Sequence, residues 1–284
     1  MNQPTPNTES TPAPDGFLPA GTHRFDEGLR VTRQDHTVWI ELTRAHDHHR
    51  ITDGMLDTLL RLCDVLRDDA QASVVVIRGE GDVFFSTGLL NPVLRGQLSK
   101  EQVLALVRKA NRVFDAIEAL PQVVVAAING NAVAGGVELA LACDIRYAAS
   151  HAVARLPEAS WGGFPGAGAP FRLATLVGKA HALDMIAGSE PFDATEMLRI
   201  GLVQRVWDRA TFDADLASCV ARMAAAGPLA LKGTKRVAAI RQEPGFGAAR
   251  QLSDALRHAL EYSEDVDEGL AAAKAQRTPN YKGR

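Results

Sequence analysis

The chain has 284 residues, of which 46% are hydrophobic and 23% charged, and it carries a net charge of −3. This is the composition of an ordinary globular protein of one to two domains, and it lacks the strong basic excess of nucleic-acid-binding proteins. No apolar run approaches the roughly 18 residues of a membrane helix. We therefore expect neither a nucleic-acid partner nor a membrane partner.

The cysteine pattern bears on the redox environment. Three cysteines, with no CxxC spacing, predict neither a disulfide framework nor a zinc knuckle. A reduced, cytoplasmic location fits this pattern best.

Residues 1–22 are rich in proline, threonine, asparagine and glycine and show no apolar periodicity. Such a segment buries too little apolar surface to offset its ordering entropy, and it lacks the basic start and apolar centre of a signal peptide. We predict a disordered tail over these residues.

Strands and helices alternate through the next part of the chain. Short β-branched runs predict strands at Thr37–Thr43, Ser73–Arg78 and Gln122–Ile128. Apolar residues at spacings of three and four predict helices around Met55–Leu66 and Leu106–Ile117. This alternation predicts an α/β fold with buried parallel strands, and we place its core at residues 23–206.

The last part of the chain, residues 207–284, is predicted to be helical. Three helices are expected at Phe212–Ala226, Leu229–Arg241 and Gly247–Tyr262, separated by glycine–proline turns. A helical third that follows an α/β core suggests a lid or an oligomerisation layer.

Two glycine-containing turns are candidate sites for an oxygen anion. A strand ending at Ile128 leads to Gly135-Gly136 and a helix that starts around Val137, whose first N–H groups have no partner within the helix. An earlier turn contains Gly88, and the N–H of Leu89 there can face that of Gly135. A tight structural turn explains the glycines equally well. The segment is neither a P-loop nor a nucleophile elbow, because it contains neither motif.

Two glutamates are candidates for acid–base chemistry. Glu138 lies in the first turn of the apolar helix, and Glu158 follows Pro157 among apolar residues that would raise its pKa. Two carboxyl groups in unlike surroundings suit paired general acid and general base roles. For Glu138 alone, a carboxylate placed to suit the helix dipole is the simpler interpretation.

From about Leu29 to Arg284 the chain resembles the crotonase (enoyl-CoA hydratase/isomerase) superfamily. The matching segments are Ala126–Gly130, Gly135–Ala140, Ala142–Arg146, Pro157–Glu158, Phe164–Gly168, Leu176–Ala180, Arg199–Val203, Ser263–Gly269 and Tyr281–Gly283. The resemblance implies a spiral of ββα units with a helical C-terminal trimerisation region. It aligns Leu89 and Gly135 with the oxyanion hole, and Glu138 and Glu158 with the two glutamates of the hydratases.

The chain also departs from the family pattern. Arg50 replaces a small residue in the loop that usually contacts the CoA adenine, and it is a candidate phosphate ligand. The usual Gly-Ala-Asp of the first oxyanion turn is Gly88-Leu89-Leu90 here, and a common Ala-Phe is Ala272-Ala273. The other candidate substrate-binding residues are Leu90, Trp161 and Phe164. Trp161 is either a wall of the acyl pocket or ordinary core packing.

The loop at residues 46–49 reads His-Asp-His-His but predicts no metal site, because adjacent loop residues rarely converge on one ion. We expect no cofactor apart from coenzyme A as part of the substrate.

The leading hypothesis is an enoyl-CoA hydratase that adds water across the α,β double bond of an acyl thioester. The alternatives are an enoyl-CoA isomerase, a hydrolase or carbon–carbon bond-cleaving enzyme acting on another acyl substrate, and a non-catalytic assembly protein with the same fold.

The C-terminal helices carry apolar stripes that need a partner. One consists of Leu252, Leu256 and Leu260, and another contains Leu229 and Val237. The resemblance favours burial against neighbouring subunits in a homotrimer or homohexamer. A lid folded back on its own subunit is the alternative.

Overall fold

The computed structural model describes residues 20–25, 27–242 and 246–280, and its larger sheet has seven strands in the order β1-β2-β3-β4-β6-β8-β11. These strands are β1 (Gly21–Phe25), β2 (Leu29–Gln34), β3 (Thr37–Leu42), β4 (Val74–Gly79), β6 (Val123–Ile128), β8 (Ile145–Ala149) and β11 (Arg205–Trp207). The first three strands pair antiparallel, and every pair from β3 to β11 is parallel. The predicted α/β class is confirmed.

A second, four-stranded sheet has the order β10-β9-β7-β5. Its strands are β5 (Phe84–Ser86), β7 (Asn131–Val133), β9 (Val153–Arg155) and β10 (Phe192–Asp193). Three successive turns of the chain each give one long strand to the first sheet, one short strand to the second, and then helical structure. The pairs β4–β5, β6–β7 and β8–β9 repeat this pattern, which is the expected spiral of ββα units.

The helices of the core connect or follow the strands of the two sheets. They are α1 (Asp53–Asp68), α2 (Pro92–Arg95), α3 (Lys100–Glu118), α4 (Gly135–Leu141), α5 (Ala169–Gly188), α6 (Ala194–Arg199) and α7 (Phe212–Ala224), together with the 3-10 helices η1 (Ala45–Asp47) and η2 (Glu158–Trp161). Thr52 caps the N-terminus of α1, and Ser99 and Gln102 form a capping box at the start of α3.

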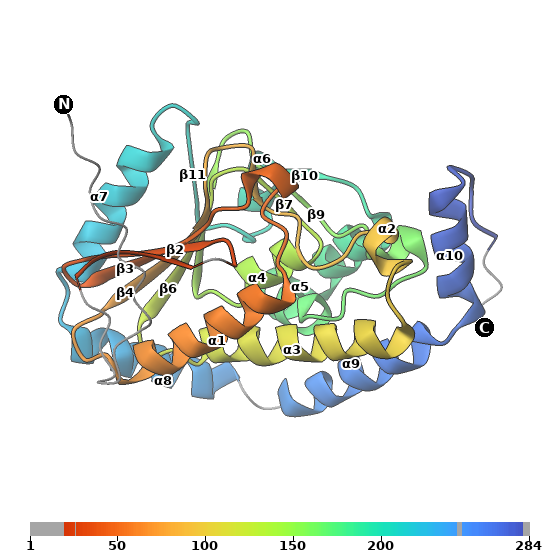
Figure 1. Cartoon of the computed structure of the whole chain (residues 1–284). Coiled ribbons are helices and arrows are strands. Elements are labelled where there is room, and N and C mark those ends of the chain that lie inside the picture. Colours follow the sequence, from red (N-terminus) through yellow and green to blue (C-terminus); the bar gives the residue numbers. More distant parts are fainter. Residues whose placement is uncertain (1–19, 26, 243–245, 281–284) are drawn as a thin grey trace, which may run out of the picture.

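The central strands β4, β6 and β8 of the larger sheet are buried on both faces, because helices cover both (Figure 1). Alternate residues of β4 point to opposite sides: Val75 and Ile77 join the core formed with α1 and α3, whereas Val74 and Val76 pack in the cluster formed with α7. Helix α7, which lies beyond the predicted core boundary at residue 206, therefore covers the second face of the sheet.

The N-terminal boundary also differs from the prediction. Gly21 and Thr22 belong to β1, where they pair with Arg33 and Thr32 of β2. Backbone pairing at the edge of a sheet needs no apolar periodicity, so the sequence pattern did not reveal this strand. Residues 1–19, the rest of the predicted tail, lie outside the described residues, as does Tyr281–Gly283.

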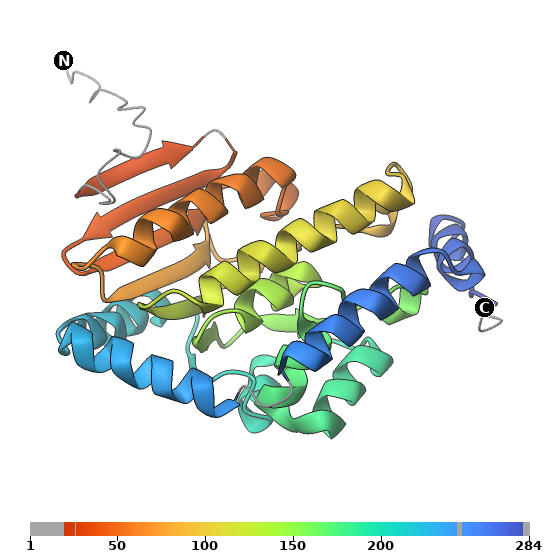
Figure 2. The same cartoon turned by 90° about the horizontal axis from the view of Figure 1, so that it is seen from below.

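The last helices are α8 (Pro228–Gln242), α9 (Phe246–Glu261) and α10 (Glu264–Lys274). Helix α9 contacts α3 and α5, and α10 contacts α2 and η2, so both return to the middle of the chain (Figures 1 and 2). In α8, Leu229 is 84% exposed and Val237 is 70% exposed. The side chains of Leu252, Leu256 and Leu260 lie outside the described residues.

Membrane-spanning potential is confined to one bent pair of helices. In the described ranges no single helix is long and apolar enough to span a membrane, and α7 with Leu229–Ala239 meets that criterion only when the two are taken together.

Candidate active site

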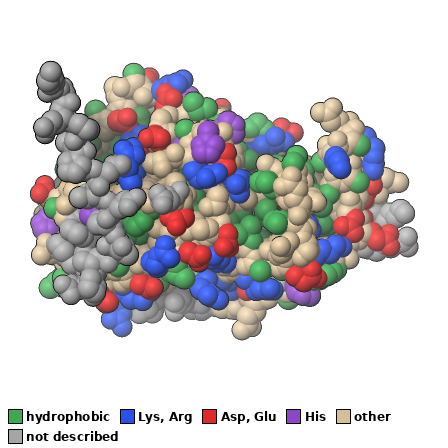
Figure 3. Space-filling model, in the orientation of Figure 1, with side chains coloured by type: hydrophobic (Ala, Val, Ile, Leu, Met, Phe, Trp, Pro, Cys, Tyr) green, Lys and Arg blue, Asp and Glu red, His purple; other side chains and the backbone are tan. Residues whose placement is uncertain are grey.

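One pocket brings together seven of the eight residues that we predicted for the site. It encloses about 620 Å³, including space open to solvent, and lies between the turns around α4 and the helices α2, α9 and α10. Hydrophobic side chains gather on the face between the sheets and α10 (Figure 3). The predicted residues that line the pocket are Leu89, Leu90, Gly135, Glu138, Glu158, Trp161 and Phe164.

Arg50 is the exception, and its assignment as a phosphate ligand stays a prediction. Arg50 does not line the pocket, and its guanidinium instead pairs with Asp47, with Nε 3.2 Å from Oδ2. Asp47 also pairs with Arg44. All three residues belong to the same loop, so these ion pairs are local and hold the Arg50 side chain against that loop.

The two glycine turns meet at one end of the pocket. Gly88 has a φ of 77°, and a β-carbon there would overlap the backbone nitrogen of Gly135. A β-carbon on Gly135 would in turn lie 3.1 Å from the backbone nitrogen of Leu89. In the described part of the chain neither Leu89 N–H nor Gly135 N–H donates a hydrogen bond. Two adjacent free donors at a pocket wall suit the binding of a carbonyl oxygen that gains negative charge.

The backbone is strained immediately before α4. Ala134 has a φ of 53° and a ψ of −125°, a region that favours glycine, and its N–H donates to the carbonyl of Arg155 at 2.9 Å. A β-carbon on Gly136 would overlap the carbonyl oxygen of Ser86. Close backbone approach therefore requires glycines here, and it presents the first amides of α4 to the pocket. Helix α4 begins at Gly135, two residues before the predicted start.

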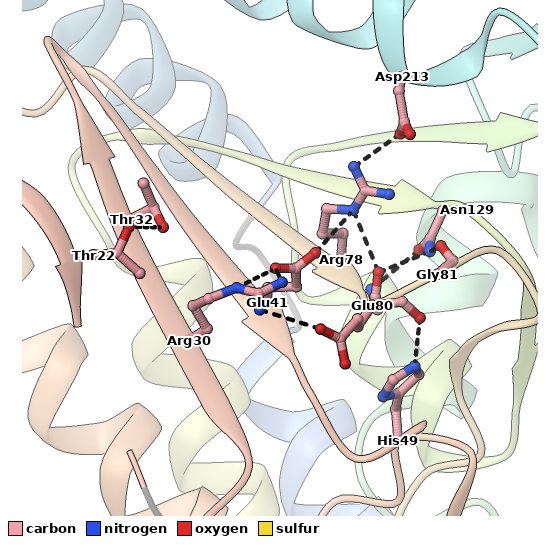
Figure 4. Close-up of polar contacts among 11 residues, drawn as sticks. Thr22, Arg30, Thr32, Glu41, His49, Arg78, Glu80, Gly81, Asn129 and Asp213 are labelled. Carbon is pink, nitrogen blue, oxygen red and sulfur yellow. Dashed lines mark hydrogen bonds and ion pairs between the residues drawn. The ribbon is translucent and has the colours of Figure 1, made fainter. Parts of the chain in front are cut away.

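A network that we did not foresee from the sequence holds the first turn. Ser86 Oγ donates to the carbonyl of His49 at 2.8 Å and accepts from Gly88 N–H at 3.0 Å. The N–H of Ile51 donates to the carbonyl of Gly88 at 2.8 Å. His49 is buried, and its Nε2 lies 2.9 Å from the carbonyl of Glu80 (Figure 4). The histidine loop thus supports the Gly88 turn, and the described residues contain no group of three or more ligands suited to a metal.

Glu138 is buried at the base of the pocket. Its Oε1 accepts hydrogen bonds from Ala167 N–H at 2.7 Å and Ala169 N–H at 3.1 Å. Burial raises the pKa of Glu138, while the two amides and the charges of Arg172 and Arg257 favour its ionised form. These bonds fix the orientation of the carboxyl group and leave Oε2 for a ligand.

Glu158 is the second carboxyl group in the pocket, at the start of η2. Its Oε2 is buried and has no hydrogen-bond partner among the described residues. Burial, with a smaller contribution from the charge of Glu138, raises the pKa of Glu158 to about 8. Glu158 is therefore mostly protonated at neutral pH, whereas Glu138 accepts hydrogen bonds that favour its charge. The two carboxyl groups suit opposite roles in proton transfer.

Two arginines in the pocket wall were not predicted. Arg95 ends α2 and Arg257 lies in α9, and both line the pocket. Arg257 and Glu261 are four residues apart on an amphipathic helix, a pattern typical of an exposed ion pair. Only their burial, 8% exposed for Arg257 and 0% for Glu261, distinguishes them from surface residues.

Comparison with known proteins covers nearly the whole described chain. Residues 32–284 match the enoyl-CoA hydratase/isomerase family model. The chain is 31% identical over 261 residues to 2,3-dehydroadipyl-CoA hydratase of Escherichia coli, covering 90% of this chain and 99% of that protein. It is 31% identical to crotonyl-CoA hydratase of Syntrophomonas wolfei over 228 residues, 79% of this chain and 87% of that one.

Solved structures agree with these sequence matches. An enoyl-CoA hydratase from Mycobacterium avium subsp. paratuberculosis superimposes with a TM-score of 0.79 at 29% identity, covering 90% of this chain and 98% of the other. An enoyl-CoA hydratase from Bacillus anthracis gives a TM-score of 0.73 at 30% identity, covering 90% and 100%.

Proposed function

Since the chain belongs to the enoyl-CoA hydratase/isomerase family and is an enoyl-CoA hydratase-like enzyme, we propose that Glu138 and Glu158 add water to an enoyl-CoA in this pocket. One observation carries the proposal: two carboxyl groups with different hydrogen-bond partners, Glu138 held by two backbone amides and Glu158 with a free buried oxygen, line the same pocket as two free backbone amides of the described chain. Coenzyme A enters as part of the substrate, and the reaction needs no other cofactor.

The amides of Leu89 and Gly135 bind the thioester carbonyl oxygen. When water attacks the β carbon, electrons move through the double bond to this oxygen and form an enolate. The two donors are already in place and change little during the reaction, so they stabilise the enolate more than the ground state.

Glu138 orients the water and takes its proton as the new carbon–oxygen bond forms. The amides of Ala167 and Ala169 hold Oε1, so Oε2 faces the water. Glu158 is protonated at neutral pH and delivers its proton to the α carbon as the enolate collapses to the thioester. A proton then returns from Glu138 to Glu158, which completes the cycle.

The direct test follows loss of enoyl-thioester absorbance with crotonyl-CoA and with longer and aromatic enoyl-CoA substrates. We expect hydration by the wild type, and a fall in kcat of about 10²- to 10⁴-fold in Glu138→Gln and in Glu158→Gln. Glu190→Gln, which removes an exposed carboxylate, is the matched control and retains wild-type turnover.

Other outcomes identify the alternatives. No turnover of any enoyl thioester would overturn the proposal. Movement of the double bond without gain of water would indicate an isomerase. Variants that melt higher, with no activity to lose, would favour a non-catalytic protein.

We also propose a homotrimer or homohexamer in the cytoplasm. Leu229 and Val237 leave apolar surface exposed on α8, and a neighbouring subunit is a suitable cover for it. The three cysteines are free and buried, which suits a reducing compartment.

A further inference from the structure

The wall of the pocket carries two positive charges from distant parts of the chain. Arg95 and Arg257 both line the cavity that contains Glu138 and Glu158. Arg257 is 8% exposed, and its Nε is buried without a hydrogen-bond partner among the described residues. Its stem lies over Gly166, where a β-carbon would be 2.7 Å from Cδ, and this contact places the guanidinium at the pocket wall.

Glu261 balances only part of this charge. Its carboxylate is 0% exposed and contacts both guanidinium groups, with Arg257 Nη1 2.7 Å from Oε2 and Arg95 Nη2 against Oε1. Asp267 also attracts Arg95, but from a greater distance, and it pairs with Lys100, so Glu261 is the carboxylate that contacts both cations directly. Burial and the neighbouring charge of Arg95 lower the pKa of Arg257 to about 10, so it remains charged at neutral pH.

The nearby acids of the catalytic centre do not neutralise this excess permanently. Glu158 is mostly protonated at neutral pH because its pKa is about 8, and Glu138 must exchange a proton during turnover. A buried charge without a partner is costly, and a guanidinium fork is well suited to a carboxylate. The arrangement therefore fits a ligand that brings its own negative charge.

We infer that the acyl group carries a carboxylate at the end distant from the thioester, bound by Arg257 and Arg95. The substrate class is then the CoA monothioesters of unsaturated dicarboxylic acids. This inference rests on the proposed function, which assigns the thioester carbonyl to Leu89 and Gly135 and the reacting carbons to Glu138 and Glu158. The arginines on α2 and α9 then contact the part of the acyl chain beyond those carbons.

Matched substrates test the inference. One pair is glutaconyl-CoA and the neutral thioester in which an isopropyl group replaces its terminal carboxylate, and a second pair is longer by one methylene. Both members of a pair carry the same coenzyme A, so phosphate contacts cancel in their ratio. We expect the wild type to favour the acid in at least one pair by about 10- to 100-fold in kcat/KM, as for charge-assisted hydrogen bonds.

Variants then assign the preference to residues. In Arg257→Gln and in Arg95→Gln we expect the ratio of kcat/KM for the acid to kcat/KM for the neutral substrate to fall at least tenfold. This holds even if the substitution slows the hydration of both substrates. Arg257→Lys keeps the charge but loses the fork, so its ratio is intermediate. Glu261→Gln removes the competing carboxylate and raises the ratio. A purely structural ion-pair cluster would instead leave the ratio unchanged in all four variants.

A binding measurement keeps the test independent of turnover and of folding defects. Calorimetry compares saturated glutaryl-CoA with its isopropyl counterpart on the wild type, and we expect the acid to bind at least tenfold more tightly. The inference would be overturned if the neutral thioester bound as tightly as the acid or more tightly. It would also be overturned if the neutral substrate were hydrated as fast as the acid, or faster, in both pairs. Either result would leave the hydratase proposal intact. Failure to hydrate any enoyl-CoA, with the acid still bound preferentially, would instead overturn the hydratase proposal alone.

Discussion

The two walls of the pocket are built in different ways. On one side the turns after β5 and before α4 meet by backbone contact, and the amides of Leu89 and Gly135 face the cavity. On the other side α9 and α10 contribute side chains, including Arg257 and Val266, and their contacts are with α2, α3, α5 and η2.

This difference separates the reaction from the choice of substrate. Backbone amides offer the same chemistry whatever side chains surround them, so the first wall suits a step common to all thioesters. Side chains on a packed helix can change without altering the sheets, so the second wall suits recognition of one acyl group.

Gly88→Ala should disrupt the pair of backbone amides in the first wall of the pocket. Its β-carbon would overlap the nitrogen of Gly135 and force the two amides apart, so we expect kcat for crotonyl-CoA to fall about 10²- to 10³-fold. The matched control is Gly81→Ala, because Gly81 has a similar φ of 74° but no atom within 4 Å of the added carbon. Steady-state kinetics and thermal melting of both variants separate the clash from backbone strain. An equal loss of kcat in both would contradict the role of the close contact.

The pH dependence tests the acid of the catalytic centre. The pKa of Glu158 is about 8, so the protonated form needed to supply the proton disappears above that value. We expect kcat to fall about tenfold for each pH unit well above 8, and Glu158→Gln to lose this limb of the profile. A flat profile between pH 7 and roughly pH 9.5 would argue against protonated Glu158 as the proton donor.

The thermal stability of the protein should also depend on the ionisation of Glu158. The pKa of Glu158 is raised above its ordinary value of 4.5, so its stabilising contribution is complete below about pH 4.5 and is lost as pH rises through 8. The Tm of Glu158→Gln relative to wild type should therefore rise between these values and then level off. Glu190→Gln is the control, and thermal melting across pH measures both.

A small change in subunit association is expected from a substitution on the surface of α8. Leu229 is 84% exposed, and its burial against another subunit would contribute about 1 kcal/mol or more. Leu229→Ala should then raise the subunit dissociation constant about fivefold, measured by light scattering across a dilution series. Leu198→Ala, on α6 and 45% exposed, should not change it. A wild-type monomer at every micromolar concentration would contradict the proposed assembly.

Much of the fold was predictable because its signals are local. β-branched runs marked β3, β4 and β6 to within one residue, and apolar spacing marked α1 and α3. The edge strand β1 was missed, because its pairing with β2 depends on backbone groups that every sequence contains. The packing of α7 against the core was also not predicted, because the sequence of a strand does not indicate which segment covers its second face.

For the site, the glycines of the two turns could be predicted from the sequence, because each depends on neighbours within a few residues. The two glutamates were paired through the resemblance to the crotonase superfamily. The folded chain was needed to show that Arg50 pairs with Asp47 and that Ser86 and His49 hold the Gly88 turn. It was also needed to show that Arg95 and Arg257 meet around a buried Glu261. The spacing of Arg257 and Glu261 is the same for a surface ion pair and a pocket wall. The packing of α9 against α3 and α5 distinguishes them, because burial depends on contacts between segments far apart in the chain.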